Sequence, residues 1–209
     1  MQIGGYDKTG FLEEEMTWAP LLSRTGDFKV GVAGMMINNH YMAGTENYSK
    51  GFLDSGTTFT YLHQNLFNIV KLHFKWYCSV DAENNCKGKM NFNRNGYLCF
   101  SYDENEFPQG PRDYFRSFPI LRFLIKTDVA GEPYYYDWYP SEYLYRDTAT
   151  QYCVALDVTS SREIMMGGTF MRQHNIYFDV EKARVGFAHA TCSPDYNQVM
   201  SEQEMIAAG

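Results

Sequence analysis

Most apolar residues of this chain fall into short runs that are typical of β-strands. Such runs alternate apolar and polar positions, or stay apolar over four to eight residues between turn-forming residues. Strands are predicted for 27–37, 118–126, 134–138 and 152–158, and for a hairpin of 175–179 with 184–189. Two further strand-like runs flank a turn between Gly51 and Leu62.

One segment has a different spacing. Leu66, Ile69, Val70 and Phe74 recur every three or four residues, which predicts an amphipathic helix over 63–77. The polar stretch 78–96 contains Asn-Asn and Asn-Gly pairs and is predicted as a loop. The pattern therefore indicates that 1–192 form a mostly-β domain, which contains one substantial helix. A polar tail follows over 193–209.

Composition argues against several kinds of partner and cofactor. The chain has 209 residues, is 44% hydrophobic and 17% aromatic, and carries a formal net charge of −7. A nucleic-acid partner is not expected, because phosphate contacts need clustered Lys and Arg. No apolar run is long enough to cross a bilayer, so we expect no membrane segment. The chain has no C-x-x-C pair and no histidines at ligand spacing, so neither a metal nor another cofactor is expected.

The most informative stretch is F-L-D-S-G-T-T-F-T-Y-L, residues 52–62, which places Asp54 in a turn between two strand-like runs. Gly56 allows a tight backbone and the close approach of a ligand. The hydroxyls of Ser55, Thr57 and Thr58 can hydrogen-bond the carboxylate or the backbone. The sequence therefore predicts either a rigid catalytic carboxylate or, more simply, an Asx turn that only stabilises a bend.

Distant motifs favour the catalytic interpretation. An apolar-apolar-Gly strand occurs at 164–167, and F-D followed by V-G-F-A occurs over 178–188. Together with D-S-G-T at 54–57, these resemble the pepsin-like aspartic peptidases, most closely the beta-secretase and plasmepsin branch. The opening residues MQIGGYDKTG and W-A-P-L at 18–21 resemble strands of the same family's C-terminal lobe. The resemblance implies the C-terminal lobe of the bilobal acid protease fold, with the helix following the catalytic turn.

The resemblance also implies roles for individual residues. Asp54 is the expected catalytic aspartate, and Gly56, Thr57 and Thr58 are expected to bind the substrate. Support of the site is expected from Ser55, whose hydroxyl would contact the other lobe or serve only the turn, and from Met166 and Gly167 beneath it. Ser55 stands where Thr is commoner, and Gly168 stands where many relatives have Asp.

The five cysteines allow two disulfides and one further thiol, although five buried free thiols remain an alternative. Cys78 and Cys86 flank a short polar segment, so we expect them to pair. The resemblance to beta-secretase implies a second pair, Cys99 with Cys153. It also implies that Cys192 bridges to a cysteine upstream of Met1, which would make Met1 an internal methionine.

In this family each lobe supplies one aspartate, and only one D-[ST]-G-[ST] occurs here. The expected function is therefore an aspartic endopeptidase lobe that needs an N-terminal lobe, acts on polypeptides, and is inactive alone. Two alternatives stay open: a half-protease that pairs with a second copy, and a non-catalytic binding or structural module. Disulfides suit the secretory pathway, in a lysosome-like or extracellular setting. Asn47, in an N-Y-S sequon, is a candidate glycosylation site.

Overall fold

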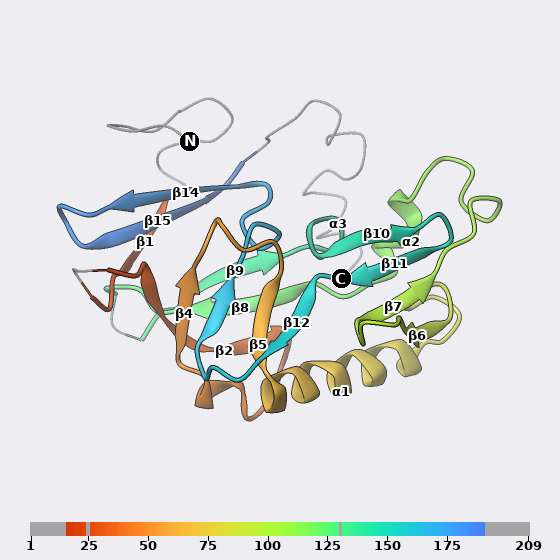
Figure 1. The fold of residues 1–209 in the computed structure, drawn as a ribbon, viewed down its shortest axis with the longest axis horizontal. Helices are drawn as coiled ribbons and strands as arrows, with labels where there is room; N and C mark the ends of the chain where they lie inside the picture. Colours follow the sequence, from red (N-terminus) through yellow and green to blue (C-terminus); the bar gives the residue numbers. More distant parts are fainter. Residues whose placement is uncertain (1–15, 24–25, 130, 191–209) are drawn as a thin grey trace.

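The computed structural model describes residues 16–23, 26–129 and 131–190, in which strands dominate and α1 is the one long helix (Figure 1). The helices are α1 (Gln64–Val80), α2 (Arg112–Arg116), α3 (Pro140–Tyr143) and the 3₁₀ helix η2 (Thr45–Asn47). The strands are β1 (Thr17–Pro20), β2 (Lys29–Ile37), β3 (His40–Tyr41), β4 (Lys50–Leu53), β5 (Thr60–His63), β6 (Met90–Phe92), β7 (Leu98–Ser101), β8 (Leu121–Ile125), β9 (Tyr134–Trp138), β10 (Leu144–Thr148), β11 (Gln151–Val154), β12 (Leu156–Thr159), β13 (Ile164–Met166), β14 (His174–Asp179) and β15 (Arg184–His189). The expectation of a mostly-β fold with one substantial helix is confirmed.

Within the described residues the strands form three sheets. The largest has the order β12-β5-β13-β4-β2-β8-β9, with β3 paired to β2. A second sheet has the order β10-β11-β7-β6, and a third has the order β1-β15-β14. In Figure 1 the large sheet lies in the middle, α1 runs below it, and the two smaller sheets lie at opposite ends. The predicted hairpin is present as β14 and β15, paired from His174 with His189 to Asp179 with Arg184.

Aromatic side chains fill the core, which explains their high share of the sequence. Trp138, Tyr136 and Tyr143 are fully buried, and so are several phenylalanines. Each buried polar tip has a partner: the Trp138 indole N–H donates to the Thr169 carbonyl at 2.9 Å, and the Tyr143 hydroxyl donates to the Pro119 carbonyl at 2.5 Å. Rings of this size bury much apolar area while these hydrogen bonds remove the penalty of burying their polar atoms.

The predicted helix is longer than its apolar spacing suggested, because α1 continues to Val80 instead of ending at Tyr77. The loop interpretation of 78–96 was therefore wrong at its start. It was also wrong where β6 forms. Contacts from the following loop hold the helix end: the Asn85 amide donates to the Tyr77 carbonyl at 3.0 Å, and Cys78 forms a disulfide with Cys86. Carbonyls at a helix C-terminus need such partners.

The single strand predicted for 152–158 is two strands. The chain leaves one sheet and joins another at Ala155, whose N–H donates to the Tyr143 carbonyl at 2.7 Å. The Ala155 carbonyl accepts from the Thr60 N–H at 3.0 Å. β11 before this point belongs to the second sheet, and β12 after it pairs in parallel with β5 at the edge of the large sheet.

Both expected disulfides are present. Cys78 and Cys86 are joined near the end of α1, and Cys99 and Cys153 join β7 to β11, where the two residues lie opposite each other in the ladder. Bonds of this kind form in oxidising compartments, which points to the secretory pathway. The expected bridge from Cys192, the polar tail over 193–209 and the boundary between them lie outside the described residues, as does the motif in MQIGGYDKTG.

In the part of the chain that the structure describes, no helix combines the length and the apolarity needed to span a bilayer.

An ionisable cluster that the sequence did not reveal lies in the core between α3, β14 and β15. Glu142 is 1% exposed, and its Oε2 accepts from the Tyr139 N–H at 3.0 Å. Its Oε1 lies 3.7 Å from Nε2 of His189, whose ring lies 5.1 Å from that of the buried His174. The Arg172 guanidinium donates to the Glu142 carbonyl at 3.3 Å. Burial raises the pKa of Glu142 to about 7, against lowering by His189, and burial lowers the pKa of His174 to about 3.

These two pKa values predict that the free energy of unfolding changes little between about pH 4.5 and 6.5. Above pH 4.5, unfolded Glu142 loses a proton that the folded state keeps until about pH 7, so stability falls as pH rises through that window. Below pH 6.5, His174 gains a proton in the unfolded state, whereas in the folded state it stays neutral until about pH 3. Stability therefore falls as pH drops from 6.5 to about 3. Between 4.5 and 6.5 the two slopes, each at most about 1.4 kcal/mol per pH unit, oppose each other.

The measurement is the free energy of unfolding by urea across this pH range. Glu142→Gln should make stability rise with pH between 4.5 and 6.5 and should remove the decline between 6.5 and 7, because the amide does not titrate and only the His174 slope remains, whereas exposed Glu83→Gln should leave the profile unchanged. An unaltered alkaline decline in Glu142→Gln would contradict this assignment.

Candidate active site

The turn that carries Asp54 is held at the top of the large sheet by β4 and β5 (Figure 1). β4 is buried at Gly51 and Leu53, and it lies between β2 and β13 in the sheet. The Leu53 N–H donates to the Phe28 carbonyl at 2.9 Å, which extends the pairing with β2 up to the turn. A central, buried strand therefore brings the carboxylate to its position.

The turn holds both oxygens of the Asp54 carboxylate. Oδ1 accepts from the Gly56 N–H at 2.9 Å, and Oδ2 accepts from the Thr57 hydroxyl at 2.5 Å. The Thr57 N–H also donates to the Asp54 carbonyl at 3.2 Å. Hydrogen bonds of this kind to a charged group are stronger than those between neutral groups, and they fix its orientation. The simpler interpretation as an Asx turn describes the Gly56 contact but not the second bond from Thr57.

A strand distant in sequence passes beneath this turn. β13 pairs in parallel with β4 and meets β5 through Met165 and Tyr61, so it lies between the two strands that carry the turn. The Asp54 N–H donates to the Met166 carbonyl at 3.0 Å. Past the strand end, the Gly168 N–H donates to the Thr57 carbonyl at 2.7 Å. The structure thus brings Met166 and Gly167 together with the turn, 110 residues earlier in the chain.

Gly167 leaves no room for a side chain. A Cβ atom at this position would lie 2.2 Å from the Phe59 carbonyl oxygen and 2.6 Å from that of Thr57. Both neighbours are backbone atoms of the turn, so they cannot rotate away. The glycine is therefore required by how closely the two segments approach.

The remaining predicted site residues differ in how exposed they are to solvent. Ser55, Gly56 and Thr58 are exposed, and the Ser55 hydroxyl has no hydrogen-bond partner among residues 16–23, 26–129 and 131–190. Thr57 is half-buried and uses its hydroxyl on the carboxylate, with Met165 Sδ 3.5 Å away. Met165 is a contact that the sequence analysis did not single out, although it sits inside the motif.

Two tyrosines beside the turn were also missed. The Phe59 ring stacks on that of Tyr145, with centroids 4.8 Å apart, and meets the Tyr97 ring edge-on at 5.5 Å. The Tyr97 hydroxyl donates to the Asp157 carboxylate at 3.2 Å. Burial, together with the charge of Asp157, raises the pKa of Tyr97 above its ordinary value. No local pattern could have found these residues, because they come from the β6–β7 hairpin, β10 and β12.

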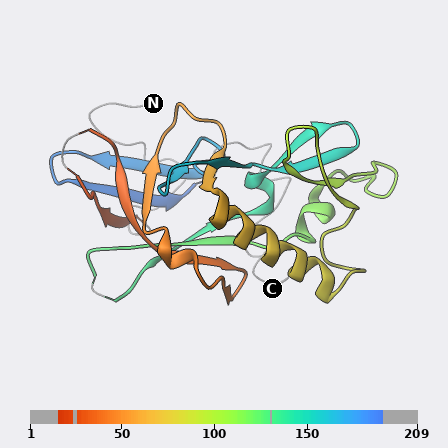
Figure 2. The ribbon, with the colours of Figure 1, turned by 60° about the horizontal axis from the view of Figure 1, so that its bottom comes forward.

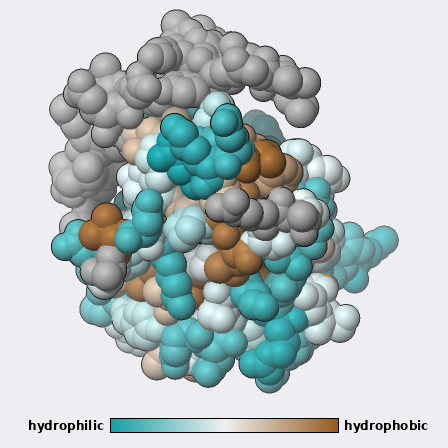
Figure 3. Space-filling model, turned by 90° about the vertical axis from the view of Figure 1, so that its left-hand side faces the viewer, coloured by the Kyte–Doolittle hydropathy of each residue, from teal (hydrophilic) through white to brown (hydrophobic). Residues whose placement is uncertain are grey.

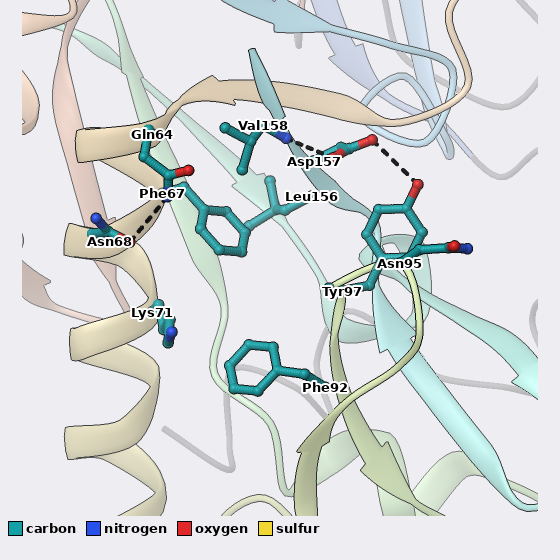
Figure 4. Close-up of a pocket in the computed structure, with 11 residues that line it drawn as sticks. Gln64, Phe67, Asn68, Lys71, Phe92, Asn95, Tyr97, Leu156, Asp157 and Val158 are labelled. Carbon is teal, nitrogen blue, oxygen red and sulfur yellow. Dashed lines mark hydrogen bonds between the residues drawn. The ribbon is translucent and has the colours of Figure 1, made fainter. Parts of the chain in front are cut away.

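A pocket of about 340 Å³ lies between α1, the β6–β7 hairpin and β12, and Tyr97 forms part of its lining (Figure 4). In the figure, Phe67 and Leu156 point into the pocket, and the Tyr97–Asp157 hydrogen bond crosses its upper edge. Lys71 and Phe92 lie at the lower edge of the pocket, away from this bond. The pocket does not include Asp54 or its neighbours in the turn.

Asn47, the sequon residue, lies in η2 and is exposed. Its side-chain amide donates to the Gly44 carbonyl at 3.1 Å, a single bond on the surface. Glycosylation there stays a prediction.

A metal site is not found among the described residues, where no group of three or more His, Cys, Asp or Glu side chains is placed to hold an ion. The turn offers one oriented carboxylate, which can accept or donate one proton. Activation of a water by a shared proton needs a second carboxylate about 3 Å away.

Comparisons with known proteins agree with this geometry. The family described as "Xylanase inhibitor C-terminal" matches residues 28–189, which contain the turn, β13 and the β14–β15 hairpin. Plasmepsin V of Plasmodium falciparum is 22% identical over 165 residues, covering 67% of this chain and 26% of that protein. Aspartic proteinase 36 of Arabidopsis thaliana is 22% identical over 208 residues, covering 92% and 38%. Aspartic protease 5 of Toxoplasma gondii is 40% identical over 55 residues, covering 26% and 6%.

The chain spans less than two-fifths of the length of each of these relatives. The matched residues include the described strands from β2 to β15, and the order of motifs is the one expected from the sequence. The chain belongs to the xylanase inhibitor C-terminal family and is a C-terminal lobe of the pepsin-like aspartic protease type.

Proposed function

We propose that this lobe supplies one of the two catalytic aspartates of an aspartic endopeptidase, and that an N-terminal lobe upstream of it supplies the other. The observation that carries the proposal is the Asp54 carboxylate, held by Gly56 and Thr57 above the strand that ends in Met166. A carboxylate fixed on both oxygens by its own turn is oriented before substrate arrives, as a proton-transferring group must be.

In the proposed reaction the two carboxylates share one proton, because two like charges this close cannot both ionise easily. The ionised member removes a proton from a water, which attacks the scissile carbonyl, while the protonated member donates its proton to the carbonyl oxygen. The carboxyl group that took the proton from water then donates it to the leaving nitrogen, while the other carboxylate removes a proton from a hydroxyl of the tetrahedral intermediate. The C–N bond breaks, an amine and a carboxylic acid are released, and the dyad again holds one proton. The exposed residues Ser55, Gly56 and Thr58 surround Asp54 on the open side of the turn, where the other lobe and the substrate backbone would lie.

The test uses the two-lobed protein that the proposal requires, with an N-terminal lobe preceding this chain. We expect it to cleave an unfolded protein substrate at acidic pH, with cleavage blocked by a pepstatin-like inhibitor. An absence of cleavage over pH 3–7 with an intact fold would reject the proposal. We further propose a lysosome-like or extracellular setting, which immunolocalisation of the same protein would test.

A second function has one observation in its favour. The matching family is named for xylanase inhibitors, so a non-catalytic role as a binding module is the competing proposal. It predicts a two-lobed protein that binds a protein partner but neither cleaves peptides nor binds the pepstatin-like inhibitor.

A further inference from the structure

The segment that follows β13 holds the Asp54 turn through the carbonyl groups of the turn. The Gly168 N–H donates to the Thr57 carbonyl at 2.7 Å. The Thr58 carbonyl accepts two hydrogen bonds from Thr169, one from its N–H at 2.9 Å and one from its hydroxyl at 3.0 Å. Two consecutive carbonyls of the turn therefore point toward the segment beneath it.

The direction of these carbonyls decides where the neighbouring N–H groups point. In a trans peptide unit the C=O and N–H groups point in opposite directions, and the described residues contain no cis peptide bond. The N–H groups of Thr58 and Phe59 belong to the same two peptide units, so they point away from the segment after β13. Neither N–H has an acceptor among the described residues. Backbone donors that face outward in this way can bind the carbonyl groups of a polypeptide lying over the turn.

A second layer of hydrogen bonds holds Thr169 itself. Tyr136 and Trp138 are alternate residues of β9, so their side chains lie on the same face of that strand. The Trp138 indole N–H donates to the Thr169 carbonyl at 2.9 Å, and the Tyr136 hydroxyl donates to the carbonyl of the next residue, Phe170. In Figure 1, β9 passes behind the upper end of β13, the light-blue strand between β4 and β5, although the two strands are four places apart in the order of the large sheet.

Burial fixes the direction of these hydrogen bonds. Trp138, Tyr136 and Phe170 are fully buried, and Thr169 is 2% exposed. The surface differs, because hydrophilic residues separate the hydrophobic areas on the face that Figure 3 shows. Water competes for hydrogen bonds at such a surface but not in the core, where a group that loses its partner is left unsatisfied. The core therefore holds the Thr58 carbonyl in one direction through Thr169.

This support comes from β9 and not from the long helix. None of the hydrogen bonds named above involves a residue of α1, which begins at the end of β5 away from the turn. Figure 2 shows α1 lying across the near side of the molecule when its bottom is turned forward. A change at Trp138 or Thr169 therefore acts on the turn without passing through the helix.

We propose that Thr169 is a positioning residue for substrate binding and that Trp138 holds it in place. Thr169 keeps the Thr58 carbonyl turned inward, so that the N–H groups of Thr58 and Phe59 face the backbone of the bound polypeptide. The inference rests on the proposed peptidase function, because it needs a substrate that lies over the turn. Thr169 touches no reacting atom. A contact made away from the scissile bond is the same in the ground state and the transition state, so its loss raises KM and leaves kcat nearly unchanged.

The test compares the kinetics of peptide cleavage by the two-lobed protein and by its Thr169→Val variant, which loses the hydroxyl but keeps the N–H bond to Thr58. We expect KM to rise about fivefold and kcat to stay within about twofold, because one of two hydrogen bonds is lost. Thr169→Ser keeps a hydroxyl and should restore the native KM. Thr169→Val/Trp138→Phe should raise KM by less than the product of the two single effects, because both changes act on the same segment.

The matched control is Thr60→Val. Thr60 is fully buried two residues after Thr58, and its hydroxyl has no hydrogen-bond partner among the described residues. The same change of side chain should therefore leave both KM and kcat close to their native values. Urea unfolding of each variant checks that the fold is kept.

A native KM in Thr169→Val, or an equal rise of KM in Thr60→Val, would overturn the inference. A fall of kcat at unchanged KM would also overturn it, because the effect would then lie on Asp54 and not on substrate binding. Equal defects in Thr169→Ser and Thr169→Val would show that the hydroxyl is not the group that matters. If the native protein cleaves no peptide, the proposed function fails and this inference fails with it. Cleavage by the native protein with unaltered variants rejects the inference alone.

Discussion

Asp54→Asn in the two-lobed protein is expected to lower peptide-bond hydrolysis by at least about 1,000-fold while leaving the fold unchanged. The amide cannot share or transfer the proton that the reaction moves between the two carboxylates. The shape of the turn should survive, because the Asn side-chain oxygen can still accept from the Gly56 N–H that now donates to Asp54 at 2.9 Å. The measurement is the initial rate of cleavage at acidic pH, with the urea unfolding curve recorded for both proteins.

The matched control is Asp128→Asn, which removes the same charge from an exposed turn between β8 and β9. It should leave the rate of cleavage within about twofold of the native value, because surface changes away from a site have small effects. If Asp54→Asn kept the native rate, Asp54 would be a structural residue and the proposed function would be lost. An equal fall in both variants would point to net charge, not to a catalytic group.

Gly167→Ala is expected to have the second largest effect, lowering the free energy of unfolding by about 3 kcal/mol and activity with it. The new methyl would meet the Phe59 and Thr57 carbonyl oxygens at 2.2 and 2.6 Å. Relief requires the turn and β13 to move apart. That movement would break the bond from the Asp54 N–H to the Met166 carbonyl and displace the carboxylate. Urea unfolding and the rate of cleavage measure the two consequences.

The neighbouring residue provides the control. A Cβ atom at Gly168 would lie 3.6 Å from the Thr57 carbonyl oxygen, an ordinary contact, and its backbone is not in the left-handed region. Gly168→Ala should therefore change the free energy of unfolding by less than about 1 kcal/mol. Equal effects at the two positions would show that the clash at Gly167 is relieved easily and that the segment beneath the turn is not what fixes Asp54.

Features that depend on local chemistry could be predicted from the order of residues alone. D-S-G-T specifies its own turn, because Gly56 and Thr57 reach the carboxylate of a residue two or three positions earlier. Strands such as β9 and β15 follow from runs whose alternation is decided within a few residues. The order of the motifs was enough to indicate the family and to place Gly167 near the turn.

Long-range contacts, in contrast, set the points at which a continuous apolar run divides into two elements and the partners that each element packs against. The run over 152–158 looks uniform, yet Ala155 is held by Tyr143 on one side and Thr60 on the other, so the chain changes sheets there. The helix passes Tyr77 because Asn85 satisfies a carbonyl at its end. In both cases the deciding hydrogen bond comes from a residue that no local window contains.

The pKa of a side chain and its exposure to solvent also depend on residues that are distant in the sequence. From the sequence alone, Glu142 is only a polar residue. In the fold it contacts Tyr139 and His189, which is 47 residues later, and its burial raises its pKa. The spacing of Leu72 and Val80 places them on one side of a helix, while only the packing of the opposite face shows that they stay exposed. Periodicity fixes which residues share a face, and the free energy of burying that face depends on neighbours that the fold brings from elsewhere in the chain.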